Sequence, residues 1–415
     1  MEGVTLFHTQ SCERKQLVLL DDRFAEGART VEGDKVPCMQ TEDGVLALVT
    51  LPSMGSVSLL PDQTEAVETV SAYTEGENYV LCNENLKAVF NANGELISLT
   101  DRNTGKERIG GVSNRLHLYR DLPRAFDGWD IDSQTENREV DMDLQCSAEV
   151  ILEKGLRAAI RFTTSFSQSQ MVQTVTLDAG AKRLDFNTKV DWHECHKLLK
   201  VFFNTGIDAV EAANQIQFGH VMRPAHRSQH LDRDRFEVCN HGFTAMFEAA
   251  RGAAVLNDCK YGVSMKDGEI GLSLLRAAVN PDQVADQGEH TFVYSYYVWD
   301  GAWENSGIVQ EAAALNTQVY MAAGSSAATS YLTVDEPNVI IETVKLAEDG
   351  SGDLIVRAYE SMNGTRAAKL RTAFDFSRAY ECNMLEKPSK ELIAENGSVG
   401  LEFRPFEIKT LRVQR

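Results

Sequence analysis

The stretch RLDFNTKVDW at residues 183–192 alternates polar and apolar side chains, which is the pattern of a half-buried β-strand. The same alternation recurs in short runs at residues 45–51, 86–90, 156–166, 290–299 and 353–360. Turn sequences rich in Gly, Asn and Asp separate the runs, as in NANGE, DAGAK, MKDGE and EDGSGD. Helical patterns are rare, and a short helix is predicted only near residues 306–314. The sequence therefore predicts an all-β fold built from β-sandwiches.

Domain boundaries are predicted where loops interrupt the strand-rich blocks. One boundary lies near residue 75, at the loop YTEGENY, and another lies near residue 330, after GSSAATS. We expect a small N-terminal β-sandwich domain at residues 1–75, a large central domain at 76–330 and a C-terminal β-sandwich domain at 331–415. The central segment is too long for a simple sandwich, so one large two-sheet sandwich is expected there.

The composition limits the partners and the compartment. A formal net charge of -20 over 415 residues argues against binding to a phosphate backbone. No apolar run approaches the ~20 residues of a membrane helix, so no membrane is expected as a partner. The start, MEGVTLFHTQ, lacks the basic and apolar regions of a signal peptide. The eight cysteines are scattered without a CxxC pair, which indicates reduced thiols and favours the cytoplasm.

One stretch carries chemistry suited to a sugar. Residues 114–136 read NRLHLYRDLPRAFDGWDIDSQTE and place four aspartates around Trp129, behind a strand-like run. Carboxylates accept hydrogen bonds from sugar hydroxyls, and an indole ring packs on the apolar face of a sugar. The alternative interpretation is an ordinary polar turn that ends a strand.

The same stretch resembles the signature N-x-L-x-L-Y-x-D-x-P-x-x-x-D-A-W-D-I of family 38 α-mannosidases, with Gly128 at the usual alanine. Further blocks resemble the C-terminal half of that family, in the family's order. They are LFHTQSCERKQLVLL (6–20), LPSMGSVSLL (51–60), DWHECHKLLKVFFN (191–204), FGHVMRPAHRSQHLDRDRFEVCNHGF (218–243), YGVSMKDGEIGLSLLRAAVNPDQVADQGEHTFVYSYYVWDGAW (261–303) and PFEIKTLRV (405–413). The pattern is not perfect, since His8 replaces the usual Asn and Asn204 the usual Pro. The resemblance spans the chain and implies that the central domain is a galactose-mutarotase-like super-sandwich.

The resemblance implies the C-terminal β-rich portion of a zinc-dependent retaining α-mannosidase. In that family an N-terminal α/β barrel carries the aspartate nucleophile and a zinc site with a His-x-Asp pair. These parts are expected to lie outside this chain, so no cofactor is expected within it and zinc is expected in the N-terminal half. The expected partners are that catalytic half and an α-mannoside. Because retaining hydrolysis needs two carboxyl groups about 5 Å apart, the chain alone is predicted to be inactive.

The resemblance also implies candidate substrate-binding residues. In related enzymes a few β-domain residues complete the sugar pocket opened by the barrel. The matching positions are Asp127, Trp129 and Asp130, and Arg276 in LSLLRA is a further candidate because its rigid fork can reach hydroxyls. The alternative for Arg276 is a buried ion pair with Asp282 or Asp286.

The histidines do not predict a metal site. His220, His226 and His230 follow an H-x5-H-x3-H spacing that suits no helix or hairpin site, with His241 nearby. A polar network that holds a loop is expected instead, made of Arg223, His226, Arg227 and Asp232.

Two other functions remain open on the sequence alone. One is a stand-alone carbohydrate-binding or assembly module. The other is a sugar epimerase, which needs an acid and a base facing one ring. Strand alternation places His193 and Glu194 on opposite faces, which counts against an epimerase. A homo-oligomer is also possible if a surface made to cover a barrel is apolar.

Overall fold

The computed structural model describes residues 3–65, 67–395 and 397–414. Strands dominate these residues, which confirms the all-β prediction. The predicted short helix is α2 (Ile308–Asn316). The remaining helical elements of the described residues are α1 (His230–Asp234) and the 3-10 turns η1 (Asp22–Phe24), η2 (Ser133–Asn137) and η3 (Trp303–Asn305).

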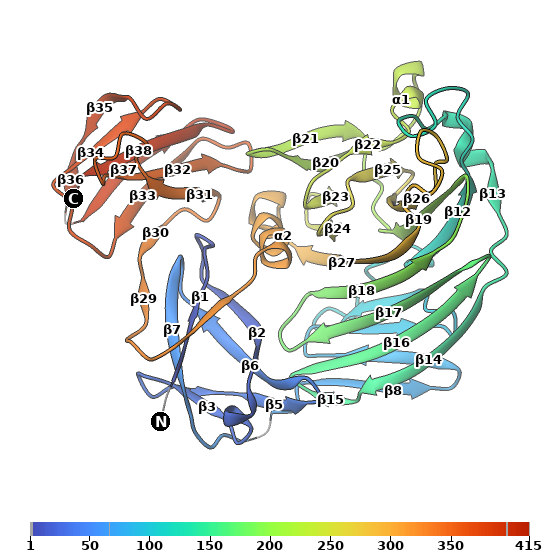
Figure 1. Cartoon of the computed structure of the whole chain (residues 1–415), viewed down its shortest axis with the longest axis horizontal. Helices are drawn as coiled ribbons and strands as arrows, with labels where there is room; N and C mark the ends of the chain where they lie inside the picture. The colour runs from blue at the N-terminus through green and yellow to red at the C-terminus, as the bar shows by residue number, and fades with distance from the viewer. Residues whose placement is uncertain (1–2, 66, 396, 415) are drawn as a thin grey trace. The chain divides into compact units, whose positions relative to one another are not determined.

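The chain divides into two compact units, whose helices and strands carry labels in Figure 1. Unit 1 contains the described residues of 1–67, 216–220 and 309–415, and unit 2 contains residues 68–215 and 221–308. The candidate site residues all belong to unit 2. The three-domain division at residues 75 and 330 stays a prediction.

Unit 2 is built from long antiparallel sheets. The long sheet runs in the order β14 (Gln145–Leu152), β16 (Arg157–Phe166), β17 (Ser169–Asp178), β18 (Arg183–Trp192), β27 (Gly288–Asp300), β24 (Arg251–Asn257), β23 (Phe243–Glu248), β20 (Glu211–Ile216) and β21 (Gly219–Pro224). The β19 sheet runs in the order β13 (Glu139–Val140), β12 (Arg115–Arg120), β19 (Lys197–Asn204), β26 (Glu269–Arg276), β25 (Gly262–Lys266) and β22 (Val238–Cys239). A further sheet runs β11 (Leu96–Asp101), β10 (Leu86–Phe90), β9 (Asn78–Cys82), β8 (Val70–Glu75) and β15 (Lys154–Gly155).

Alternation explains why the long sheet and the β19 sheet pack together. On β18 the side chains of Phe186 and Trp192 are buried, whereas Lys189 between them is exposed. Phe203 of β19 belongs to the same core, and its ring lies 5.6 Å from that of Phe186. Burial of one face of each sheet supplies the main stabilisation of unit 2, at roughly 25 cal/mol per Å² of apolar surface.

Unit 1 holds two separate hydrophobic cores among its described residues. Around the first lie two sheets, in the orders β28 (Tyr320–Ala323), β1 (Val4–Phe7), β7 (Gly55–Pro61), β3 (Ala28–Thr30), β4 (Lys35–Val36), with β29 (Thr329–Ser330) on β7, and β2 (Arg14–Leu20), β6 (Gly44–Leu51), β5 (Cys38–Thr41). Two further sheets lie around the second core. One runs in the order β30 (Leu332–Val334), β33 (Arg366–Thr372), β37 (Ser398–Phe403), β36 (Ala394–Glu395). The other runs in the order β31 (Val339–Leu346), β32 (Leu354–Glu360), β38 (Ile408–Gln414), β34 (Arg378–Cys382), β35 (Pro388–Leu392).

Within the described ranges, no helix has the length and apolar character needed to cross a membrane.

Candidate functional site

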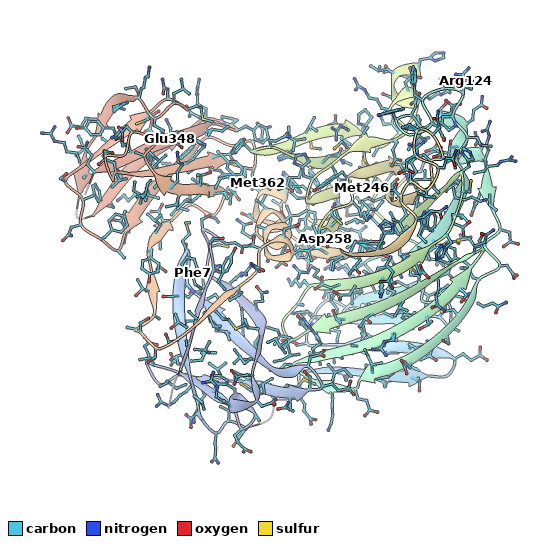
Figure 2. The ribbon with its side chains drawn as sticks, in the orientation of Figure 1. Phe7, Arg124, Met246, Asp258, Glu348 and Met362 are labelled. Atoms are coloured by element: carbon cyan, nitrogen blue, oxygen red, sulfur yellow. The ribbon has the colours of Figure 1, made fainter. Side chains whose placement is uncertain are left out.

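The Asp-Trp loop, residues 121–132, leaves the end of β12 at one end of unit 2. Figure 1 shows this loop, α1 and the loop after β26 close together at that end. Figure 2 labels Arg124 on the loop, where its side chain projects outward. Phe126 adopts φ 56°, and its carbonyl accepts hydrogen bonds from the amides of Trp129 (2.8 Å) and Asp130 (2.9 Å). These bonds close a tight turn that presents Trp129.

Arg276 holds this loop in place. It ends β26 opposite Leu198, and its Nε donates to Asp121 Oδ2 at 2.5 Å. Its Nη2 donates to the carbonyl oxygens of Asp127, at 3.0 Å, and Asp130. The fold therefore brings Arg276 together with the segment that contains the other candidates. The alternative interpretation, a buried ion pair, is correct in kind but not in partner, because Arg276 pairs with Asp121 and not with Asp282 or Asp286.

Asp127 ties the Asp-Trp loop to the loop after β26. Its Oδ2 accepts the amides of Val279 (2.8 Å) and Asn280 (3.0 Å). Its Oδ1 lies 3.5 Å from Nδ1 of His196. The Asp127 carboxylate is therefore engaged in positioning two loops against each other.

Trp129 is the candidate most open to a ligand. Its side chain is 73% exposed, beside Phe126 at 71%. Asp130 is also exposed, and its Oδ1 accepts the amide of Ile131 at 3.0 Å. An exposed indole next to a carboxylate can offer a stacking face and hydroxyl acceptors to one sugar ring. The role of these residues in substrate binding stays a prediction.

Asp121 supplies the electrostatic anchor of the site. The residue is only 1% exposed, and its Oδ1 has no hydrogen-bond partner among the described residues. Burial raises the pKa of Asp121, and the Arg276 guanidinium opposes that rise. The sequence interpretation missed this role. The available signal was its place two residues after the strand-like run RLHLY, at the start of the loop.

The histidines do not form a metal site within the described ranges, where no group of three potential ligands occurs. A His-x-Asp spacing does exist at His230 and Asp232, and the expectation that this pair lies outside the chain overlooked it. Both residues lie in α1, where positions two apart point in different directions. Asp232 is engaged with the amide of Gln229 at 3.1 Å.

The predicted polar network is correct only for one pair. His226 Nδ1 lies 3.6 Å from Asp232 Oδ2. Arg227 instead forms an ion pair with Glu136, and Arg223 donates to the carbonyl of Cys239 at 2.9 Å.

The geometry around Glu194 disfavours an epimerase. Glu194 is 3% exposed and accepts hydrogen bonds from Ser167 Oγ, Ser169 Oγ and the amide of Gln168, at 2.9 to 3.0 Å. His193 is exposed and lies 2.8 Å from Asp191. Both residues lie just after β18, which ends at Trp192, so strand alternation does not separate them; instead Glu194 is buried and His193 is exposed, and each has a different partner.

Together these features define an antiparallel multi-sandwich protein with a loop-borne aromatic and acidic surface on its largest sandwich. Residues 81–284 match the family model of the glycosyl hydrolases family 38 C-terminal domain. Residues 338–411 match the model of the glycosyl hydrolases family 38 C-terminal beta sandwich domain. The two matches together cover more than half of the chain, which belongs to glycosyl hydrolase family 38 and corresponds to its C-terminal region.

The similar curated proteins are named alpha-mannosidases. Alpha-mannosidase 2C1 of Homo sapiens is 35% identical over 384 residues, which cover 88% of this chain and 37% of the relative. Alpha-mannosidase G of Dictyostelium discoideum is 32% identical over 348 residues, covering 80% of this chain and 32% of the relative. The chain thus spans about a third of the length of the curated relatives it matches.

A solved structure shows the same fold. The crystal structure of an alpha-mannosidase from Enterococcus faecalis V583 superposes with a TM-score of 0.76 at 16% identity. The match covers 99% of this chain and 56% of the other.

Proposed function

We propose that this chain is the C-terminal part of a zinc-dependent retaining α-mannosidase and completes the sugar pocket of the enzyme's N-terminal catalytic half. The observation that carries the proposal is the Arg276 clamp, which holds the Asp-Trp loop in a fixed shape while Trp129 stays exposed. A preorganised aromatic face costs little to order when the sugar binds.

The candidate residues divide into two roles in this proposal. Trp129 and Asp130 contact the sugar, through the ring face and a carboxylate oxygen. Arg276 and Asp127 position Trp129 and Asp130, because the guanidinium of Arg276 and the carboxylate of Asp127 form hydrogen bonds with the backbone of the loops. The nucleophile and the zinc ligands come from the N-terminal half, so the chain alone does not hydrolyse α-mannosides, with or without added zinc.

The cytoplasm is the proposed compartment. All eight cysteines are free, and the exposed ones (Cys195, Cys239 and Cys259) would be prone to oxidation in a secreted protein.

The test combines this chain with a family 38 N-terminal catalytic half and measures hydrolysis of an aryl α-mannoside. Trp129→Ala should lower kcat/KM by roughly 5- to 150-fold, the equivalent of losing about 1–3 kcal/mol of transition-state binding. The matched control is Tyr73→Ala, which removes a partly exposed aromatic from β8 and should leave kcat/KM unchanged. Equal kcat/KM for the Trp129→Ala and unmodified enzymes would reject the pocket role.

A further inference from the structure

The face of the β19 sheet that points away from the core of unit 2 carries a buried charged residue and is not simply exposed to solvent. On β19, Leu199, Val201 and Phe203 point into the core of unit 2. The alternate positions therefore face outward, and Lys200 among them is only 4% exposed. Lysine is rarely buried unless its charge is paired, so this position requires a specific environment.

A cavity of about 200 Å³ lies over this face. Its floor includes Lys200 and Phe202 of β19, and its roof comes from two segments, residues 131–137 and 227–237. An ion pair between Arg227 and Glu136 joins these segments, with Nη2 to Oε1 at 2.6 Å. The cavity is therefore a partly open hollow lined by unit 2 alone, and it shares no lining residue with the Arg276 clamp.

Hydrogen-bonding groups on the cavity wall are left available. Lys200 Nζ donates to Glu237 and to Ser264 Oγ (2.9 Å), which uses two of its three N–H groups. Glu237 in turn accepts from Ser273 Oγ. Tyr119 is 8% exposed and lines the same cavity, so its hydroxyl is a further polar group near a ligand there.

The Tyr119 hydroxyl stays a donor across the physiological range. Burial raises its pKa well above the ordinary value, and the neighbouring carboxylates, Glu139 and Glu136 first, raise it further. A neutral hydroxyl can both donate to and accept from a ligand oxygen.

The residues that line the cavity have no net formal charge, so they do not favour a charged ligand. Their cations and anions balance, with Lys200, Lys266 and Arg227 against Glu136, Glu237 and Glu269. Phe202 and Phe236 add aromatic walls. Balanced polar groups beside aromatic rings suit a neutral molecule that has hydroxyls at its rim and apolar C–H faces.

We propose that this cavity is a binding site for one neutral monosaccharide in its ring form, distinct from the exposed ring of Trp129 and from the Arg276 clamp. The size restricts the ligand to a single ring, because pockets for drug-sized molecules measure roughly 300–1,000 Å³. The sugar hydroxyls form hydrogen bonds with the Tyr119 hydroxyl and with the remaining N–H group of Lys200. The apolar face of the sugar ring packs on the ring of Phe202. This site goes beyond the proposed pocket function and needs no catalytic half.

The test is isothermal titration calorimetry of the full chain with D-mannose. We expect saturable binding of one equivalent. Tyr119→Phe removes only the hydroxyl and should weaken binding by about fivefold, which equals about 1 kcal/mol at 1.4 kcal/mol per tenfold. Tyr73→Phe makes the same change on β8, outside the cavity, and should bind as the unmodified chain does. Thermal unfolding of each variant checks that the chain stays folded.

A second variant tests the lysine. Lys200→Met should abolish the binding, and an unchanged affinity in a folded Lys200→Met chain would overturn the proposed contact. A folded chain that gives no saturable heat with D-mannose, or binds D-glucuronate or D-mannosamine more tightly, would overturn the proposal. Loss of binding in Trp129→Ala but not in Tyr119→Phe would place the sugar on the Asp-Trp loop and would also overturn it. The proposed mannosidase role is independent of these results, because it is measured by hydrolysis with the catalytic half.

Discussion

Replacing Arg276 by methionine should strongly destabilise unit 2. Asp121 is 1% exposed, and Arg276 supplies its only side-chain partner among the described residues. Arg276→Met therefore leaves a buried carboxylate without a cation. Removing one partner of a buried ion pair costs about 3–5 kcal/mol, and we expect a loss of unfolding free energy in that range at neutral pH.

A double variant separates buried charge from lost packing. In Asp121→Asn/Arg276→Met the buried group is uncharged, so the double variant should be more stable than Arg276→Met alone. Arg161→Met is the matched control, since Arg161 is 43% exposed in its pair with Glu149 on the surface of unit 2. An exposed pair contributes about 0–1 kcal/mol, so this control should change stability little.

The assay is urea unfolding followed by tryptophan fluorescence. The four tryptophans, at positions 129, 192, 299 and 303, all lie in unit 2, so the signal reports on that unit. Loss of Arg276 removes the effect that opposes the raised pKa of Asp121. A carboxyl whose pKa is raised by folding favours the folded state at low pH and loses that advantage as the pH rises.

The Arg276→Met deficit should therefore shrink as the pH falls from 7 towards 5. A cost below about 1 kcal/mol, or a double variant no more stable than Arg276→Met, would refute the anchoring role of this pair.

Three further predictions concern unit 2. Burial raises the pKa of Asp101, but its bonds to Arg108 and to neighbouring amides outweigh burial and hold that pKa at about 2. The stabilisation from this lowered pKa is present above the ordinary value of 3.8 and is lost as the pH falls towards 2. Asp101→Asn should therefore remove about 2 kcal/mol of the loss of unfolding free energy that the unmodified chain shows on acidification. Curves of unfolding free energy against pH that run parallel for the variant and the unmodified chain would contradict this. Gly252→Ala should cost about 1–3 kcal/mol in urea unfolding, because a Cβ there would lie 1.9 Å from the buried ring of Trp299, and an unchanged midpoint would show that the ring can move. Trp129→Ala should change the unfolding free energy by less than about 0.5 kcal/mol, because the ring is 73% exposed, and a larger loss would assign it a structural role.

Local patterns were sufficient for the fold class. The alternation on residues 183–192 is reproduced by β18, which buries Phe186 and Trp192 and exposes Lys189. Successive side chains of a strand point to opposite faces because of the backbone geometry. A strand that buries one face therefore needs an apolar residue at every second position. The Asp-Trp stretch and the other blocks also identified the family correctly, because their residue order is a property of the chain itself.

The partners within the site could not be read from the chain. The sequence marked Arg276 as a substrate-binding candidate, with an ion pair to the nearby Asp282 or Asp286 as the alternative, whereas its carboxylate partner Asp121 lies 155 residues away. The strand pairing of β12, β19 and β26 brings the two together. In the same way, nothing in the segment KLLKVFFN tells that Lys200 lies beneath residues 131–137 and 227–237.

The sequence by itself determined which residues alternate, where turns interrupt them and which family they resemble, because these depend on neighbours along the chain. The tertiary structure decided which charges are buried, which carboxylate meets Arg276 and which groups surround the cavity. Burial and ion pairing depend on distances between residues far apart in sequence, and only the packing of one sheet and its covering loops sets those distances.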